Sequence, residues 1–264
     1  MIKRLFLKSY VWLVLAFMYL PMVVLFIYSF NVNPGMGNWS GGFQLKLYAD
    51  VFTGPNSEGI LSALGNTLLI AFASGVLSLA LGTLGAVGIN SMKKKMRTAV
   101  NTVVKLPMIN AEIITALSFL IFFAAIGLQA GYLTLIIAHT AFCTPFVLLS
   151  VLPKLQQVNN NSYEAALDLG ATPAQALTKV IIPQIFPAMV SGFLMALTIS
   201  VDDFVITQFN IGSFNTLSTY IYTHGIKKPL PPELRALSVI IFIAALALLY
   251  TANRLSNKNN KKEN

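Results

Sequence analysis

Charged side chains are scarce in this sequence. They make up 10% of its 264 residues, whereas soluble domains carry about 25%. Apolar residues account for 56% of the chain, and its mean hydropathy is +0.71. A soluble globular protein with so few charges could not cover its surface with polar groups. Collagen, coiled-coil and disordered chains are excluded as well, because there is no short repeat and too much apolar content.

Acidic residues are scarcer still. Nine Asp and Glu stand against 18 Lys and Arg, which gives a net charge of +9. The basic residues do not suggest a nucleic-acid-binding face, because they occur in clusters between apolar stretches. Such clusters are typical of orientation signals in membrane proteins. We therefore expect a lipid bilayer, and no nucleic acid, among the partners of this chain.

Cysteine and histidine are too few for a disulfide framework or a metal site. The single cysteine, Cys143, excludes an internal disulfide and is interpreted as a small core residue. The two histidines are interpreted as a packing residue, His139, and a solvated loop residue, His224. No Gly-Lys dipeptide occurs, so the chain has no P-loop and cannot hydrolyse ATP by that route. We expect no metal, no cofactor and no catalytic residue.

Six apolar stretches are long enough to cross a bilayer, since a spanning helix needs roughly 20 residues. The first follows Lys3, Arg4 and Lys8, but no small-x-small cleavage site comes after it, so we expect a retained helix and not a signal peptide. The sequence thus predicts an all-α, polytopic membrane protein. One transmembrane domain covers residues 1–255, and a disordered tail covers 256–264. The predicted spans are 10–30, 61–89, 98–126, 132–152, 185–209 and 237–254.

The distribution of Lys and Arg predicts the orientation. With the N-terminus in the cytoplasm, 13 of the 18 basic residues fall in cytoplasmic segments and four fall outside. Lys105 remains, near the inner end of the third span, where it can reach the interface. Both termini are therefore expected in the cytoplasm.

The second predicted span carries small residues four positions apart: Ser74, Ser78, Gly82 and Ala86. Small residues let transmembrane helices approach closely. The stripe therefore predicts a helix-packing surface.

The long cytoplasmic segment 153–183 carries the most informative pattern. Glu164 suits the first turn of a helix, and Gly170 suits a helix end. Thr172 and Pro173 then fit the N-cap and first position of a second helix. These residues predict a helix, a glycine turn and a second helix, which are too polar to lie in hydrocarbon and are suited to docking into a partner.

This segment resembles the EAA loop in the permease subunits of bacterial ABC importers. In that family Glu-Ala-Ala is followed, after three residues, by Gly and, after nine more, by Ile-x-Leu-Pro. Here the pattern reads Glu164-Ala165-Ala166, Gly170 and Val180-Ile181-Ile182-Pro183, with the same spacing. We expect the second helix to end at that proline. The resemblance implies a type I ABC importer permease-like bundle with a cytoplasmic coupling helix. It also implies that Glu164, Ala165, Ala166 and Gly170 form the surface that couples to the ATPase.

Four further stretches are similar to the spermidine/putrescine permeases of this family: 66–67, 139–147, 200–204 and 232–237. The resemblance implies a bacterial inner-membrane subunit that forms half of the pathway of an ATP-driven polyamine importer. Two cytoplasmic ATP-binding subunits would bind and hydrolyse the ATP. The other implied partners are a second, different permease chain and an extracytoplasmic polyamine-binding protein, which would meet the loops 31–60 and 210–236.

Three acidic residues fall inside predicted spans: Glu112, Asp202 and Asp203. An acid at the centre of a membrane helix costs about 2.5–3.5 kcal/mol, and such residues face the bundle interior or a watery cavity. Straight helices would place Glu112 roughly 21 Å and the aspartates roughly 26–27 Å from the inner helix ends, in the outer half of the membrane. Because neighbours on a helix differ by about 100°, only one aspartate is expected to face the pathway.

We expect at least one of these acids to attract the ammonium groups of a polyamine, with cation–π contributions from Tyr220 and Tyr222. A structural role stays open at this point. The acids would then pair with Lys105, accept hydrogen bonds or cap an interrupted helix.

Other functions also remain open. The same machine could import ferric iron, thiamine or an oxyanion, although carboxylates along the path argue against an anion. Intramembrane acids also suit an ion-coupled secondary transporter, but the EAA loop and the lack of detectable inverted repeats count against it. A purely structural membrane anchor gives no reason for three acids inside spans.

Overall fold

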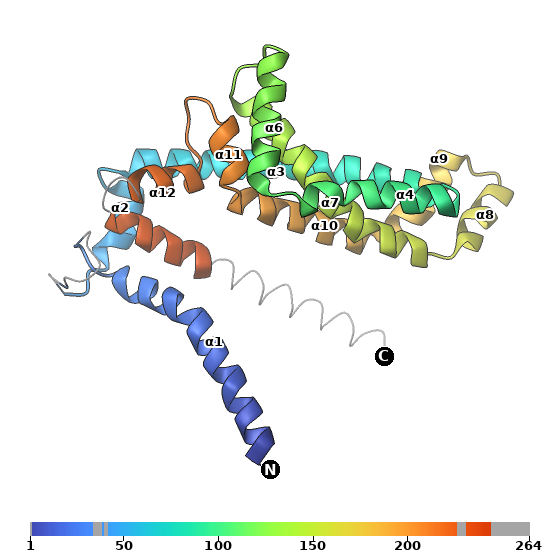
Figure 1. Ribbon diagram of the computed structural model, residues 1–264. Coiled ribbons are helices and arrows are strands. Elements are labelled where there is room, and N and C mark those ends of the chain that lie inside the picture. The colour runs from blue at the N-terminus through green and yellow to red at the C-terminus, as the bar shows by residue number, and fades with distance from the viewer. Residues whose placement is uncertain (1, 34–38, 40–41, 226–230, 244–264) are drawn as a thin grey trace. The chain divides into compact units, whose positions relative to one another are not determined.

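The computed structural model describes residues 2–33, 39, 42–225 and 231–243. All regular elements within these residues are helices, which confirms the all-α class. The chain divides into two compact units (Figure 1): residues 1–62 together with 220–264, and residues 63–219. Helices α3 (Ser57–Asn90) and α12 (Leu217–Gly225) each contribute to both units.

The first unit begins with α1 (Ile2–Tyr28), followed by α2 (Lys46–Thr53). Its later part contains a helical stretch at 232–243. The segment Tyr10–Tyr28 is apolar and long enough to cross a membrane, and none of it is buried within the protein. A helix that is apolar all round and not covered by protein is suited to lipid.

Aromatic and charged side chains hold the chain that follows α1. The ring of Phe30 lies 5.3 Å from that of Tyr48 on α2. Arg235 is 1% exposed. Its Nη2 donates hydrogen bonds to the backbone carbonyls of Asn31, at 3.3 Å, and Asn33, at 2.7 Å. The guanidinium thus joins the 232–243 stretch to the end of α1.

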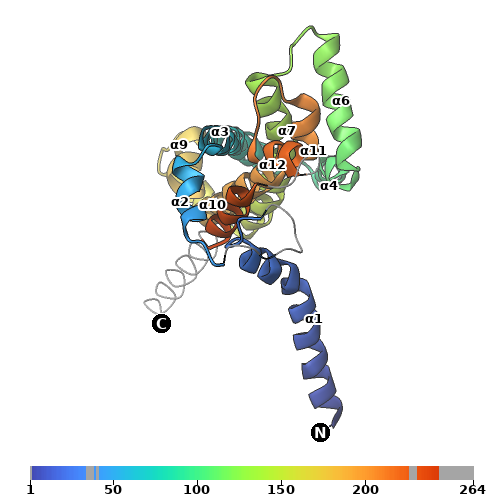
Figure 2. The same cartoon turned by 90° about the vertical axis from the view of Figure 1, so that its left-hand side faces the viewer.

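The second unit contains most of α3 and, within the described residues, eight further α-helices and one π-helical turn. The α-helices are α4 (Lys94–Val104), α5 (Leu106–Ile109), α6 (Glu112–Ala125), α7 (Tyr132–Gln157), α8 (Asn160–Asp168), α9 (Pro173–Ala176), α10 (Ile182–Asp202) and α11 (Val205–Asn210), and the π-helical turn η1 (Leu177–Ile181) lies between α9 and α10. Figures 1 and 2 both show α6 standing steeply on the helices α3, α7 and α10, which run side by side.

Small residues let α3, α7 and α10 approach closely. The predicted stripe on α3 is buried. A Cβ added at Gly82 would lie 2.8 Å from the side chain of Val147 on α7, and one at Gly192 on α10 would lie 3.2 Å from the same valine. Ser78 donates to the carbonyl of Thr140 across the α3–α7 contact, at 3.1 Å. The packing role predicted for the stripe is confirmed.

Four helical segments are long and apolar enough to cross a membrane: Tyr10–Tyr28, Ser57–Asn90, Tyr132–Gln157 and Pro173–Asp202. They match the first, second, fourth and fifth predicted spans. The third predicted span corresponds to Lys94–Ile109 followed by Glu112–Ala125, a pair bent by 98°. Of the sixth, residues 237–243 are helical, and the rest lies outside the described residues.

Two predicted spans are interrupted, so the prediction of straight helices there was wrong. In the third, Pro107 lies in the first turn of the short α5, and Asn110 and Ala111 are extended at ψ 146° and 131°. In the fifth, Asp203 is extended at ψ 125° and separates α10 from α11. The depths of roughly 21 Å and 26–27 Å worked out for the acids on straight helices therefore do not apply.

Candidate pathway acids and coupling loop

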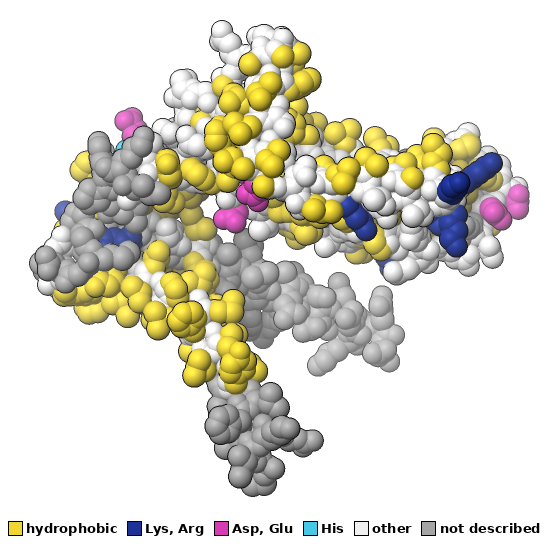
Figure 3. Space-filling view, in the orientation of Figure 1, with side chains coloured by type: hydrophobic (Ala, Val, Ile, Leu, Met, Phe, Trp, Pro, Cys, Tyr) yellow, Lys and Arg dark blue, Asp and Glu magenta, His cyan; other side chains and the backbone are white. Residues whose placement is uncertain are grey.

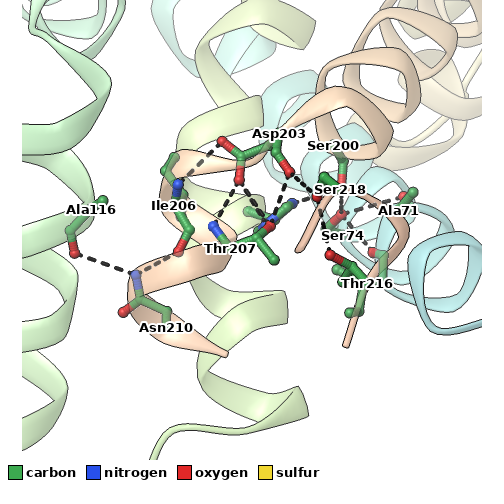
Figure 4. Close-up of polar contacts among 12 residues, drawn as sticks. Ala71, Ser74, Ala116, Ser200, Asp203, Ile206, Thr207, Asn210, Thr216 and Ser218 are labelled. Atoms are coloured by element: carbon green, nitrogen blue, oxygen red, sulfur yellow. Dashed lines mark hydrogen bonds and ion pairs between the residues drawn. The ribbon is translucent and has the colours of Figure 1, made fainter. Parts of the chain in front are cut away.

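Asp203 caps a helix at the break between α10 and α11. Its Oδ2 accepts a 2.8 Å hydrogen bond from the backbone N–H of Thr207 and a 2.9 Å bond from the Thr207 hydroxyl. Its Oδ1 accepts from the N–H of Ile206 at 3.4 Å. Figure 4 shows the carboxylate directed at these two residues of α11. A carboxylate at this place satisfies N–H groups that have no partner within the helix and suits the helix dipole.

Asp202 differs from its neighbour because its side chain is exposed. It is the last residue of α10, whereas Asp203 is 9% exposed and lies among polar side chains. The two side chains thus have different surroundings, and the reason is the break after Asp202, not the turn of a continuous helix. That only one of them faces the pathway stays a prediction. Of the structural roles left open by the sequence, Asp203 has that of capping an interrupted helix.

Glu112 lies at the other helix break. It is the first residue of α6 and is exposed, directly after the extended pair Asn110 and Ala111. Its carboxylate belongs to the first turn of α6, where negative charge is favourable. Lys105 is exposed between α4 and α5, and no ion pair within the described residues joins it to any of the three acids.

A buried polar cluster surrounds Asp203. His139 on α7 is 2% exposed. Its Nδ1 lies 2.7 Å from Ser200 Oγ on α10, and its Nε2 lies 3.0 Å from Thr207 Oγ1 on α11 and 3.5 Å from Asp203 Oδ2. Ser200 Oγ is also 3.2 Å from Ser74 Oγ on α3. The cluster is packed without a cavity large enough for water among the described residues that line it, so it offers no room for a substrate.

The two candidate tyrosines lie on α12 in the first unit. Tyr220 is buried, and its ring stacks on that of His224 with 4.1 Å between the ring centroids. His224 is half-buried on α12, so the prediction of a solvated loop residue was wrong. Burial, and secondly the nearby Glu233 carboxylate, raise the pKa of the Tyr220 phenol. In Arg235, burial lowers the pKa of the guanidinium and Glu233 opposes that shift. Tyr222 is half-buried.

The coupling loop has the helix–turn–helix form expected. Glu164, Ala165 and Ala166 lie on α8, but this helix begins at Asn160, so the prediction that Glu164 lies in its first turn was wrong. Gly170 follows α8 at φ +83°, a left-handed conformation that favours glycine. Thr172 caps α9 in a reciprocal pair with Gln175: its hydroxyl accepts from the N–H of Gln175 at 3.3 Å, and the Gln175 amide oxygen accepts from the N–H of Thr172 at 3.0 Å.

The end of the second helix was predicted wrongly. The chain does not stop at Pro183 but continues through η1 into α10, which makes Pro173–Asp202 one apolar helix. Pro183 occupies the first turn of α10, where its missing N–H is tolerated, directly after the wider π turn. The coupling loop is therefore joined to the fifth span without an intervening break.

A cavity of about 500 Å³ lies beneath this loop, between it and the ends of α3 and α7. Glu164 lines it, and so do Tyr163, Asn90 and Ser91. In the same part of the unit, Figure 3 shows Lys and Arg side chains gathered toward the end that carries α8 and α9. No group of three or more His, Cys, Asp or Glu side chains suited to a metal ion occurs in the part of the chain that the structure describes.

Residues 78–259 match the family described as the binding-protein-dependent transport system inner membrane component. The chain belongs to this family.

Relatives within the family match nearly the whole chain. The spermidine/putrescine transport system permease protein PotC of Haemophilus influenzae is 32% identical over 260 residues, which cover 98% of this chain and 99% of the relative. The putrescine transport system permease protein PotI of Escherichia coli K12 is 31% identical over 233 residues, covering 86% of this chain and 82% of that protein. The resemblance to polyamine-type permeases seen in the sequence is confirmed.

Solved importers share the fold. A bacterial ABC transporter that imports the acidic polysaccharide alginate superposes with a TM-score of 0.73 at 22% identity, over 97% of this chain and 95% of its own. A chain of the inward-facing MetNI methionine ABC transporter gives 0.62 at 19% identity, over 76% of this chain and 96% of its own. The expected ABC importer permease fold is confirmed, and the protein is a multi-pass membrane protein.

Sequence reasoning missed the polar cluster as a unit of this permease. His139 was correctly expected to be a packing residue, but its partners on α10 and α11 were not foreseen. Ser200 and Thr207 stand seven positions apart on either side of the break, and only the fold brings both to His139. An interruption signal was nevertheless present, because Asp203 lies two residues before the start of α11, and an Asp near a helix start is a capping signal.

Proposed function

We propose that this protein is a permease subunit of an ATP-driven polyamine importer and carries spermidine or putrescine across the membrane by alternating access. The observation that supports this most strongly is the presence of exposed carboxylates, Glu112 and Asp202, at two helix breaks of a membrane protein. Exposed acids are unfavourable against lipid and so belong to a watery path or a partner. Carboxylates suit an oligocationic cargo, and full-length relatives carry polyamine names.

The three acids then have two different roles. Glu112 and Asp202 attract ammonium groups, while Asp203 holds the helix break beside Asp202. Figure 3 shows acidic side chains at the surface near the lower end of α6, consistent with an accessible location. Tyr220 and Tyr222 stay candidates for a weaker cation–π contribution, with Tyr222 the more exposed of the two.

Partners complete the machine. Of two cytoplasmic ATP-binding subunits, one docks on the loop formed by α8, Gly170 and α9, where Leu169 is 89% exposed. A second permease chain supplies the other half of the path, and an extracytoplasmic binding protein delivers the polyamine. A solved alginate transporter with the same fold has a periplasmic protein bound, which supports this arrangement. Both termini lie in the cytoplasm, as the Lys and Arg distribution favours, and the chain itself binds no cofactor.

The test is uptake of radiolabelled spermidine and putrescine into proteoliposomes that hold the complete complex. We expect uptake to require both ATP and the binding protein. Glu112→Gln and Asp202→Asn should each reduce uptake without loss of the assembled complex, whereas Thr102→Ala should not, because Thr102 is exposed and its hydroxyl bonds only within α4. ATPase activity stimulated by another solute, such as thiamine, without polyamine uptake would refute the cargo. A chain that purifies with no ATPase would refute the coupling role.

A further inference from the structure

One imidazole touches both sides of the α10–α11 break. His139 reaches Ser200 on α10 with Nδ1, at 2.7 Å, and Thr207 on α11 with Nε2, at 3.0 Å. Asp203, the residue at the break itself, is 3.5 Å from the same Nε2. Because an imidazole ring is rigid, these contacts fix the separation of the two helix ends, and α7 supplies a long helix as the support.

The donors and acceptors are arranged in one direction. The Thr207 hydroxyl has one proton, which goes to Asp203, where Oδ2 lies at 2.9 Å and the backbone carbonyl at 3.2 Å, so its oxygen is left to accept from His139 Nε2–H. A neutral imidazole carries a single N–H, so His139 Nδ1 then accepts and Ser200 Oγ donates to it. We therefore assign the Nε2–H tautomer of a neutral imidazole, in which each ring nitrogen has its partner.

The break also depends on the first two residues of α12. The Ser218 hydroxyl donates to the backbone carbonyl of Asp203 at 3.0 Å, and the N–H of Leu217 donates to Thr67 Oγ1 on α3 at 2.8 Å. Figure 4 shows Ser218 and Ser200 on the α10 side of Asp203, and Thr207 on the other side. Asp202 lies in the sequence between Ser200 and Asp203, which these hydrogen bonds hold in place, although its own side chain is exposed.

We propose that His139 is a positioning residue for transport: by binding Ser200 before the break and Thr207 and Asp203 after it, it sets the place at which Asp202 meets the cargo. The proposal rests on the proposed function, because Asp202 is its pathway carboxylate. His139 touches no cargo itself. It acts through the backbone of the break.

Two substitutions separate the contact of His139 with Ser200 from its contacts with Thr207 and Asp203. An asparagine amide reaches about as far as Nδ1, so His139→Asn keeps a partner for Ser200 only. A glutamine amide reaches about as far as Nε2, so His139→Gln keeps a partner for Thr207 and Asp203 only. Each variant loses one buried hydrogen bond between residue 139 and the break. We expect this loss to lower the amount of polyamine taken up per ATP hydrolysed about tenfold, while the Thr102→Ala control keeps the wild-type amount per ATP.

A double-mutant cycle tests whether the effect passes through Asp202. If His139 acts by positioning Asp202, the variant that combines His139→Gln with Asp202→Asn is no worse than Asp202→Asn alone. Independent roles would instead multiply the two losses. The proposal would be overturned if the losses of the two single variants multiplied in the double variant. It would also be overturned if both His139 variants took up as much polyamine per ATP as the wild type.

A second measurement does not depend on the cargo. In a Cys143→Ala background, Asp202→Cys provides a single thiol whose rate of reaction with a water-soluble methanethiosulfonate reports its exposure. Cys143 is fully buried, so its removal leaves the surface unchanged. We expect His139→Asn and His139→Gln to change this rate about tenfold, since each removes one buried hydrogen bond from the break. If the complex transports no polyamine but the rate still changes, the cargo is wrong and the positioning role stands. Unchanged rates alongside normal polyamine uptake would refute the positioning role alone.

Discussion

Replacing Asp203 by asparagine should destabilise the protein, whereas the same replacement at Asp202 should leave stability unchanged. The two residues are neighbours with the same side chain, so they form a matched pair. Asp203 is 9% exposed and accepts hydrogen bonds, while Asp202 is exposed at the end of α10. The pair therefore separates a structural acid from the proposed pathway acid within one dipeptide.

The magnitude follows from the donors around Asp203. Thr207 directs an N–H and an O–H at its Oδ2, and the Nε2–H of His139 is 3.5 Å away. An asparagine side chain is about as good a cap as aspartate, so the cap itself costs little. Its NH₂ group, however, meets donors in place of an acceptor, and one buried donor loses its partner. We expect a cost of about 1–3 kcal/mol.

Thermal unfolding of the purified complex measures this cost. A loss of that size lowers the melting temperature by roughly 2–12 °C in a chain of this length. Asp202→Asn should stay within about 0.5 kcal/mol of the wild type, as exposed substitutions do, yet it should reduce uptake. Equal melting temperatures for Asp203→Asn and the wild type would refute the reasoning, and so would a destabilised Asp202→Asn.

Three other predictions concern packing, the coupling turn and alkaline pH. Gly82→Ala should cost about 1–3 kcal/mol in thermal unfolding, because its Cβ would lie 2.8 Å from a side chain on α7; Gly88→Ala, with nothing within 4 Å, is the control and should cost nothing. Gly170→Val should strain a φ of +83° by roughly 1–2 kcal/mol and weaken ATPase co-purification, and Gly170→Asn should be milder; equal recovery of the ATPase with both variants would contradict this. Tyr220 should ionise above the usual tyrosine range, seen as the difference in phenolate absorbance between wild type and Tyr220→Phe, because burial and Glu233 raise its pKa. Because the fold favours the neutral phenol, the contribution of Tyr220 to stability is complete below the ordinary tyrosine pKa and is lost as pH rises through the raised pKa of the folded state. A difference titration at or below the ordinary tyrosine range would contradict the raised pKa of Tyr220.

The helix–turn–helix form of the coupling loop was predictable, because its turn is set by short-range rules, but the start of its first helix and the end of its second were not. A glycine at a positive φ, a threonine cap and a proline in the first turn each act within four residues of themselves. The spans were predictable from hydropathy for the same kind of reason: a helix exposed to lipid, such as α1, needs only its own length and apolar surface.

The two breaks were not predictable from apolar content, because hydropathy continues across them. Asn110 and Asp203 interrupt stretches that are apolar overall, and the break at Asp203 is held by contacts with residues far away in the sequence. The candidate site shares this limit. Asp203 and His139 are 64 positions apart in the numbering, and their contact exists only because α7 packs on α10 and α11. The sequence therefore located the acids but could not divide them into one buried cap and two exposed carboxylates.

The short α6 has a consequence for the order in which the protein assembles in the membrane. Its 14 residues extend about 21 Å, which is less than the roughly 30 Å of hydrocarbon that a stable span must cross. It therefore needs a neighbour to stay inserted. One such contact is the hydrogen bond from Asn210 Nδ2 on α11 to the carbonyl of Ala116, at 3.3 Å and across 94 positions of sequence. During synthesis α6 emerges well before α11, so we expect the third span to remain a loosely held hairpin until α11 has left the ribosome.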